Sequence, residues 1–225
     1  MSNPISILIP IYNGIEFLNQ SLSSVIQQTY KNWEVIIGIN GHSPDSTIEK
    51  KAIEVVSQLN KNNNFDIRII YYNTNGKPAT LNKMVIDTKY PYIAILDVDD
   101  IWIDVKLEKQ LKYLDVYDVV GTGCRYFGDS NHSPNLPYGD LRNFNFLYFN
   151  PIINSSVIIR KECAYWNENE ILDDYDLWLR LYNEKKKFFN VDEYLVLHRI
   201  HKDSSFNGTN HLHVDELKNK WSKIF

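Results

Sequence analysis

The chain has 225 residues, of which 44% are hydrophobic and 23% charged, and its formal net charge is −4 at pH 7. This length and composition are typical of one large globular domain with a sizeable core. The small negative charge argues against a nucleic-acid partner, because nucleic-acid binders carry a basic excess. The two cysteines, Cys124 and Cys163, lack metal-ligand spacing and are expected to be free thiols.

The first half of the chain alternates strand and helix patterns. Runs of β-branched and other apolar residues predict strands at 5–10, 34–39, 67–72 and 92–96. Helical spacing predicts helices at 15–29 and at about 79–88, and a third helix after the cap residue Ser46, where Glu49 completes a capping box. This rhythm predicts an α/β fold with a mainly parallel sheet and helices on both faces.

The second half is less regular. Strands are predicted at 116–121, 155–160 and 195–200, a long loop at 129–145, and helices at 173–183 and near 214–221. Neither a repeat nor a linker interrupts the sequence. We therefore expect one domain over residues 1–225 whose second half builds the far side of a site.

Three carboxylates end the apolar run at 93–96: Asp97, Asp99 and Asp100. Asp97 and Asp99 are two positions apart, so both point the same way at the end of an extended segment. This arrangement suits a hard divalent cation, which takes oxygen ligands and shares them with phosphates. In the alternative interpretation, Asp100 caps a helix entered at residue 101 and the other two carboxylates are solvated.

Further polar residues follow the other predicted strands. Ligands of open parallel sheets bind at the carboxyl ends of the strands, where this sequence places Pro10, Tyr12 and Asn13, then Asn40, and then Lys77. A ring and amides suit a base and ribose, and a lysine suits a phosphate. A nucleoside-diphosphate site is plausible, whereas a dehydrogenase or nucleoside triphosphatase is disfavoured because the glycine-rich phosphate motifs are absent from the sequence.

At this point the chain resembles the family-2 glycosyltransferases, which have the GT-A fold. The resemblance covers roughly residues 4 to 205 and rests on four motifs in family order. They are the amino-terminal signature at 5–13 with 22–30, the Asp-x-Asp motif at 96–102, the acidic motif at 173–180, and an Arg-x-His element at 198–201.

The resemblance implies roles for the residues that bind the nucleotide sugar. Tyr12 would stack on or line the base, and Asn40 stands where many members place an Asp that binds the base, usually uracil. Asp97 would bind the ribose. The remaining residues expected at the nucleotide sugar are Pro10, Asn13, Lys77 and Val98, of which Lys77 would approach the diphosphate.

The resemblance also implies a metal site and a catalytic base. Asp99 would hold the Mn²⁺ or Mg²⁺ that bridges the diphosphate, and His201 resembles a histidine that completes the metal shell in some members. Asp174 would be the general base. The alternatives are a solvated turn lysine for Lys77 and an ordinary helix start for Asp174.

One position departs from the family pattern, and one aromatic residue has two interpretations. Ile39 replaces an acid that often follows strand two, so only Asn40 can read the base edge there. Uridine is the first choice of nucleotide, with thymidine and guanosine as competitors. Trp178 is expected in the core rather than as an acceptor platform.

The implied function is metal-dependent, inverting transfer of a sugar from a nucleoside-diphosphate sugar, preferably a UDP-sugar, to a hydroxyl of a glycan or related acceptor. Residues of about 1–115 would form the donor half, about 116–205 the acceptor and catalytic half, and 206–225 a tail with a short helix. The alternative is a non-catalytic sugar-nucleotide-binding or scaffold domain. The first apolar run, 5–9, is too short for a membrane span or a signal peptide, so we expect no membrane span and a cytoplasmic location.

Overall fold

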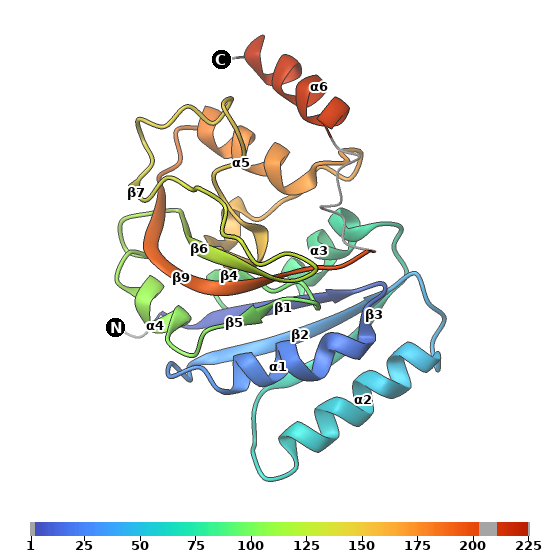
Figure 1. The fold of residues 1–225 in the computed structure, drawn as a ribbon. Coiled ribbons are helices and arrows are strands. Elements are labelled where there is room, and N and C mark those ends of the chain that lie inside the picture. The colour runs from blue at the N-terminus through green and yellow to red at the C-terminus, as the bar shows by residue number, and fades with distance from the viewer. Residues whose placement is uncertain (1–2, 203–210, 225) are drawn as a thin grey trace.

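The structure is a computed structural model that describes residues 3–202 and 211–224. A single sheet runs through both halves of the chain in the order β3-β2-β1-β4-β8-β6-β9-β5, with β7 paired to β9 (Figure 1). The strands are β1 Ile5–Ile11, β2 Trp33–Asn40, β3 Ile67–Tyr72, β4 Tyr92–Ile95, β5 Ile101–Trp102, β6 Val119–Gly128, β7 Gly139–Asp140, β8 Ile158–Arg160 and β9 Phe188–Ile200.

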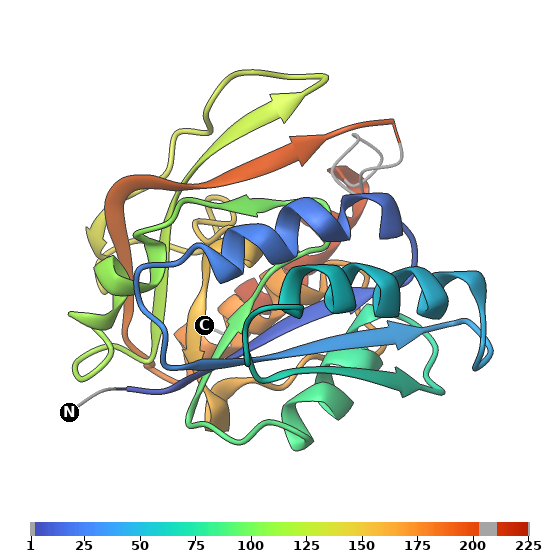
Figure 2. The ribbon, with the colours of Figure 1, turned by 90° about the horizontal axis from the view of Figure 1, so that it is seen from below.

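Helices cover both faces of this sheet (Figures 1 and 2). α1 and α2 pack on one face, and α3, α5 and α6 pack on the other. The helices are α1 Leu18–Ile26, α2 Thr47–Asn60, α3 Lys77–Ile86, α4 Lys106–Leu111, α5 Asp173–Asn183 and α6 His211–Ser222, with short 3₁₀ helices at Ile15–Phe17, Asn154–Ser156 and Lys161–Cys163. Strands β1 to β4 are parallel to one another. The predicted α/β fold with a mainly parallel sheet is confirmed.

The alternation of side chains along β1 explains why the sheet needs helices on both faces. Ile7 and Ile9 join the cluster that contains Leu22 of α1, whereas Leu8 joins the cluster that contains Leu81 of α3. All of β1 is buried. A strand buried on both faces must be almost continuously apolar. This pattern is the one that predicted β1 from the sequence.

The second half differs from the predicted strands in length and direction. β8 is antiparallel to both of its neighbours, β4 and β6. β9 begins at Phe188, seven residues before the predicted start, because it pairs with β5, β6 and β7 along its length. The interpretation of Asp100 as the cap of a helix entered at residue 101 is wrong, since residues 101 and 102 form β5 and the next helix starts at Lys106.

Local signals set two helix starts in the first half. Ser46 caps α2 as predicted, with its hydroxyl accepting from the backbone N–H of Glu49 at 3.3 Å. α3 begins at Lys77, two residues before the predicted start, with Pro78 in its first turn. Gly76 precedes it with φ +89°, a backbone conformation that favours glycine. This turn places Lys77 at the helix end that faces the carboxyl end of β4.

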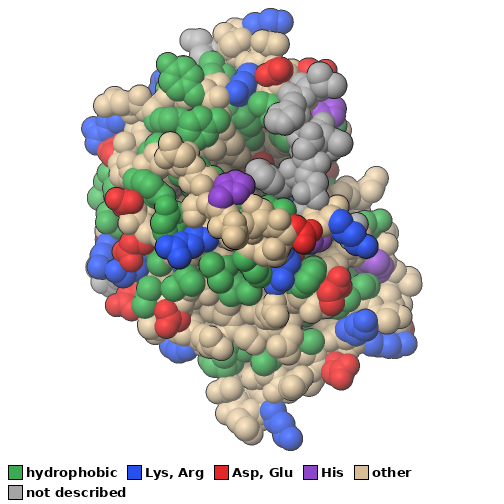
Figure 3. All heavy atoms as spheres, in the orientation of Figure 1, with side chains coloured by type: hydrophobic (Ala, Val, Ile, Leu, Met, Phe, Trp, Pro, Cys, Tyr) green, Lys and Arg blue, Asp and Glu red, His purple; other side chains and the backbone are tan. Residues whose placement is uncertain are grey.

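Charges of both signs are mixed on one face of the molecule (Figure 3). On the face in Figure 3, basic side chains interleave with acidic ones, and the described residues drawn there form no extended basic patch. Among residues 3–202 and 211–224, no helix combines the length and the apolar character that crossing a membrane requires.

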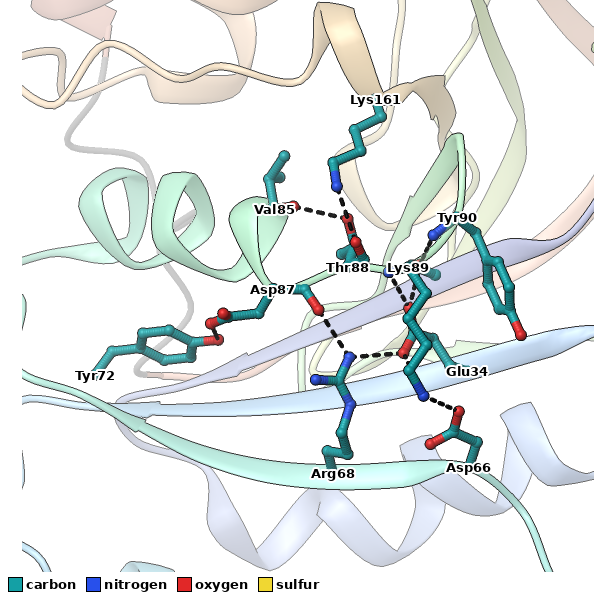
Figure 4. A network of polar contacts seen from close by, with 11 residues as sticks. Glu34, Asp66, Arg68, Tyr72, Val85, Asp87, Thr88, Lys89, Tyr90 and Lys161 are labelled. Carbon is teal, nitrogen blue, oxygen red and sulfur yellow. Dashed lines mark hydrogen bonds and ion pairs between the residues drawn. The ribbon is translucent and has the colours of Figure 1, made fainter.

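A buried carboxylate joins the amino ends of the parallel strands. Glu34, at the start of β2, is fully buried. It accepts from Ser6 Oγ of β1 at 2.6 Å, from Arg68 of β3 at 2.7 Å, and from the backbone N–H of Lys89 before β4 at 2.6 Å (Figure 4). Glu34 lies six residues before Asn40, about 20 Å along the strand. This network therefore serves the fold from the end of the sheet that is remote from the cavity described below.

We expect Glu34→Gln to lower the free energy of unfolding by about 1.5–3 kcal/mol, the range for hydrogen bonds to a charged group. The amide keeps the shape of the side chain but loses the ion pair with Arg68 and one acceptor. Denaturant unfolding measures the change. A stability equal to that of the parent would contradict the structural role of this network.

Candidate active site

A cavity of about 850 Å³ opens at the carboxyl ends of the parallel strands. It contains nine of the ten residues predicted for the site: Pro10, Tyr12, Asn13, Asn40, Lys77, Asp97, Val98, Asp99 and His201. The tenth, Asp174, is not part of the cavity wall. Residues that lie up to 191 positions apart in sequence therefore share one cavity, as expected for the carboxyl edge of a parallel sheet.

Tyr12 presents its ring at this cavity. The side chain is 58% exposed, and its ring centroid lies 5.5 Å from that of His42. His42 also contacts the backbone carbonyl of Tyr12. Gly41 has φ +72°, and a Cβ there would lie 2.3 Å from the Tyr12 ring, so only glycine leaves room for this arrangement. The exposed ring is suited to stacking on a base. His42 received no role from the sequence.

Asp97 and Lys77 form an ion pair in the cavity wall. The Lys77 ammonium lies 2.5 Å from one Asp97 oxygen, and the Asn154 amide donates to the other oxygen at 3.1 Å. Burial favours the neutral carboxyl, but Lys77 and Asn154 outweigh it and lower the pKa of Asp97. Burial also opposes the charge of Lys77, but Asp97, Asp173 and Asp174 raise the pKa of its ammonium. Lys77 is therefore not a solvated turn residue, and Asn154 is a neighbour that the sequence did not reveal.

Asp99 and His201 meet across the cavity, with 3.1 Å between the carboxylate and Nε2 of the imidazole. Burial, together with the charges of Asp100 and Asp97, raises the pKa of Asp99. A cation bound there would relieve this crowding of carboxylates. One oxygen and one imidazole nitrogen fit Mn²⁺ better than Mg²⁺. Within residues 3–202 and 211–224, no group of three or more His, Cys, Asp or Glu side chains could hold a metal ion.

Asp100 contributes to this site from inside the core. It is fully buried, and its carboxylate accepts from the backbone N–H of Arg199 at 2.9 Å and lies 3.0 Å from Nδ1 of His198. Burial opposes the charged imidazolium, but the hydrogen bond and charge of Asp100, with the charges of Asp97 and Asp99, raise the pKa of His198. This link to β9 spans almost 100 residues, and no local pattern indicated it.

Asp174 lies in the first turn of α5 and interacts electrostatically with Lys77 and Asp97. Its carboxylate accepts from the backbone N–H of Tyr175 at 2.7 Å and from the Asn150 amide at 3.3 Å. Burial and the charge of Asp173 raise the pKa of Asp174 to about 6, although Lys77 opposes this shift. A carboxylate with such a pKa takes up a proton readily near neutral pH, which is the property that a general base needs.

Three predictions for apolar packing are confirmed. Trp178 is fully buried in the core and has a T-shaped contact with Phe188, so it is not an acceptor platform. Cys124 and Cys163 are buried free thiols. Trp178 and the other buried residues that follow Asp174 anchor α5 in the core.

Two solved structures share this fold. Residues 1–349 of TarS from S. aureus, in complex with UDP-GlcNAc, superpose with a TM-score of 0.75 at 14% identity, over 97% of this chain and 66% of that chain. The mannosyltransferase PcManGT from Pyrobaculum calidifontis, in complex with GDP-Man and Mn²⁺, gives a TM-score of 0.69 at 12% identity, over 89% of this chain and 58% of that chain. This chain thus spans less than two thirds of each. The fold is that of the GT-A glycosyltransferases.

Sequence comparisons identify the family. The model of glycosyl transferase family 2 matches residues 6–168, and the chain belongs to this family of glycosyltransferases. It is 29% identical over 218 residues to the O-antigen biosynthesis glycosyltransferase WbnJ of Escherichia coli, covering 89% of this chain and 81% of that protein. It is 30% identical over 213 residues to the uncharacterized glycosyltransferase MJ1057 of Methanocaldococcus jannaschii, covering 87% of this chain and 70% of that protein.

Proposed function

We propose that the chain transfers a sugar from a nucleoside-diphosphate sugar, preferably a UDP-sugar, to a hydroxyl of a glycan or related acceptor, with inversion at the anomeric carbon. The observation that carries this proposal is the single cavity shared by the nine predicted residues. The partly buried carboxylate of Asp174 lies close enough to Lys77, which lines that cavity, to help raise the pKa of its ammonium. A cytoplasmic location stays a prediction.

The nucleotide would bind at the Tyr12 end of the cavity. Asn40 is the last residue of β2 and lines the cavity, although the residue is only 3% exposed. Its amide would therefore contact a base bound at this end of the cavity. An amide both donates and accepts, so it can pair with the edge of uracil, thymine or guanine. Uridine remains the first choice. The solved relatives hold UDP-GlcNAc in one case and GDP-Man in the other, so both nucleotides belong in the test.

The diphosphate would bind between Lys77 and the Asp99–His201 pair. Asp99 and His201 would hold Mn²⁺ or Mg²⁺. When bound, the cation would supply positive charge that stabilises the leaving diphosphate. Lys77 contributes a further positive charge from the start of α3. Asp97, fixed by Lys77 and Asn154, would orient the ribose.

Asp174 would accept the proton of the acceptor hydroxyl. The hydroxyl oxygen bonds to the anomeric carbon while the bond from that carbon to the diphosphate oxygen breaks, so the diphosphate leaves with the electron pair. One base acting opposite one leaving group inverts the anomeric centre. No covalent bond between sugar and protein forms.

A donor screen tests this proposal. UDP-, dTDP- and GDP-sugars are each incubated with candidate glycan acceptors and Mn²⁺, and release of the nucleoside diphosphate is measured alongside calorimetry of donor binding. We expect acceptor-dependent release with a UDP-sugar. Donor binding without release by any acceptor would instead support the non-catalytic binding or scaffold domain.

His201→Ala tests the second proposed metal ligand. Imidazole prefers Mn²⁺ to Mg²⁺, so removal of His201 should lower activity by about tenfold or more and narrow the preference for manganese. Thermal stability without donor should stay close to that of the parent. Unchanged activity and an unchanged ratio of rates with the two metals would exclude His201 as a ligand.

A further inference from the structure

The end of β9 is fastened to the turn that carries Asp97 and Asp99. β5 pairs with β9 only through Ile101 with Leu197 and Trp102 with Val196. Beyond Leu197, this side of β9 has no further ladder partner in β5. There the buried carboxylate of Asp100 accepts from the backbone N–H of Arg199. A side chain thus takes the place of the next ladder hydrogen bond.

The side chain of Arg199 strengthens the same connection. Its Nε donates to the backbone carbonyl of Asp99 at 2.9 Å. Its guanidinium lies 4.4 Å from the ring centroid of Phe17 and 4.3 Å from that of Phe127, and it donates to Gln20 at 2.5 Å. The guanidinium is therefore held between two rings from different elements. The connection joins the Asp97–Asp100 turn, the first helical segment and β9.

His201 lies just beyond this connection, with its ring centroid 5.4 Å from that of Phe17. It follows Ile200, the last residue of β9, so the backbone ladder does not hold His201 itself. Its imidazole nevertheless contacts Asp99. The adjacent Asp100 accepts a hydrogen bond from the backbone N–H of Arg199, two residues before His201. Any shift of the end of β9 relative to the turn would separate the two side chains.

We infer that Asp100 is a positioning residue whose carboxylate fixes the end of β9 and thereby holds His201 against Asp99. Burial of a carboxylate is unfavourable unless its oxygens are hydrogen-bonded, and both oxygens of Asp100 have partners on β9. An apolar residue could fill the same space but could not bind the Arg199 amide. The effect of Asp100 on catalysis rests on the proposed function. The structural half of the inference, that Asp100 fixes the end of β9, does not depend on it.

Hydrogen exchange tests the structural half without donor or metal. Asp100→Leu fills a similar space but removes both acceptor oxygens. We expect amide exchange at residues 198–201 to accelerate by about tenfold or more, the effect of losing a hydrogen bond to a charged group. Glu34→Gln is the matched control, because it changes an equally buried carboxylate at the other end of the sheet. It should leave exchange at 198–201 unchanged. Unaltered exchange in Asp100→Leu would overturn the inference.

A double-mutant cycle with His201→Ala tests whether Asp100 acts through His201. In the parent background, Asp100→Leu should raise the donor KM about 10–100-fold and narrow the preference of the enzyme for manganese over magnesium. In the His201→Ala background, most of this effect should disappear, because the group being positioned is absent. Equal effects in both backgrounds would overturn the inference and leave Asp100 with a structural role only.

These measurements distinguish failure of the proposed function from failure of the inference about Asp100. If the parent protein turns over no donor, the proposed function fails, and the exchange experiment still decides the structural half of the inference. If Asp100→Leu does not fold, His198→Ala replaces it, because that change removes the partner of the second Asp100 oxygen. It should then accelerate exchange at the Arg199 amide, and unchanged exchange would overturn the inference.

Discussion

Asp174→Asn is expected to lower kcat by about 10²–10⁴-fold, the range for loss of a positioned general base, while donor affinity stays nearly unchanged. The amide cannot accept the proton of the attacking hydroxyl. Asp174 is not part of the cavity wall that would bind the nucleotide, so its substitution leaves the donor contacts in place. Steady-state kinetics with calorimetry of donor binding separates the two effects. An equal loss of donor binding would indicate a structural or metal role instead.

The pH dependence of kcat provides a second signature of the base. The pKa of Asp174 is raised to about 6, so its carboxylate gains a proton as the pH falls through this value. Activity of the parent should therefore decline below about pH 6, and the residual activity of Asp174→Asn should lack this decline. A parent whose activity is constant from pH 5 to 7 would argue against Asp174 as the base.

As the pH rises through the pKa of Asp174, activity should increase but the stability of the fold should decrease. Because the folded pKa of Asp174 lies above its ordinary value, the folded state binds more protons than the unfolded chain between about pH 4 and 6. Asp174 thus costs stability once the pH exceeds its folded pKa. Asp174→Asn should be at least as stable as the parent at pH 7. A clear loss of stability would mark Asp174 as a structural residue.

Asp176→Asn is the matched control on the same helix. Asp176 is 4% exposed, and its carboxylate accepts from Trp221 at 2.8 Å and from Lys220 at 3.1 Å. Both partners lie in α6, so this carboxylate docks one helix on another. Its substitution should lower stability but leave kcat close to that of the parent. The two aspartates lie two positions apart, so the contrast isolates the chemistry from the packing of α5.

The donor half could be predicted because its signals are local. Each strand from β1 to β4 is a short, largely apolar run, and the polar residues of the donor half lie at or within a few residues of the strand ends, as Asn40 ends β2 and Tyr12 follows β1. Parallel strands bring such ends together whatever the details of packing. The prediction therefore needed only the order of elements and the residues at their ends.

The other half of the site depends on contacts that are distant in sequence. Asn154 lies 57 residues from Asp97, and Asp100 lies 99 residues from the Arg199 amide that it binds. Neither residue has a local pattern that distinguishes it from a turn residue or a helix cap. β5 and the first part of β9 likewise form by long-range pairing. Tertiary structure, rather than local preference, decides these elements.

Asp99→Asn is expected to lower kcat/KM by about 10²-fold or more, because a bound cation supplies several kcal/mol of charge stabilisation to the leaving group. An amide oxygen is a poorer ligand for a hard cation than a carboxylate. Calorimetry should show that donor binding, which we expect to strengthen with Mn²⁺ in the parent, becomes nearly independent of Mn²⁺ in this variant. A rate equal to that of the parent at low metal concentration would mean that Asp99 is not a metal ligand.

Stability without metal distinguishes loss of a ligand from loss of the fold. Asp99 is crowded by the charges of Asp100 and Asp97, which help to raise its pKa. Removal of its charge should leave the metal-free protein at least as stable as the parent, while the stabilisation that Mn²⁺ and UDP give to the parent by binding the folded state should shrink. Glu34→Gln should show the reverse pattern, with lower stability but full stabilisation by Mn²⁺ and UDP. If Asp99→Asn instead lost stability without metal and kept the full response to Mn²⁺, the carboxylate would belong to the fold, and the metal would have to be assigned to other ligands.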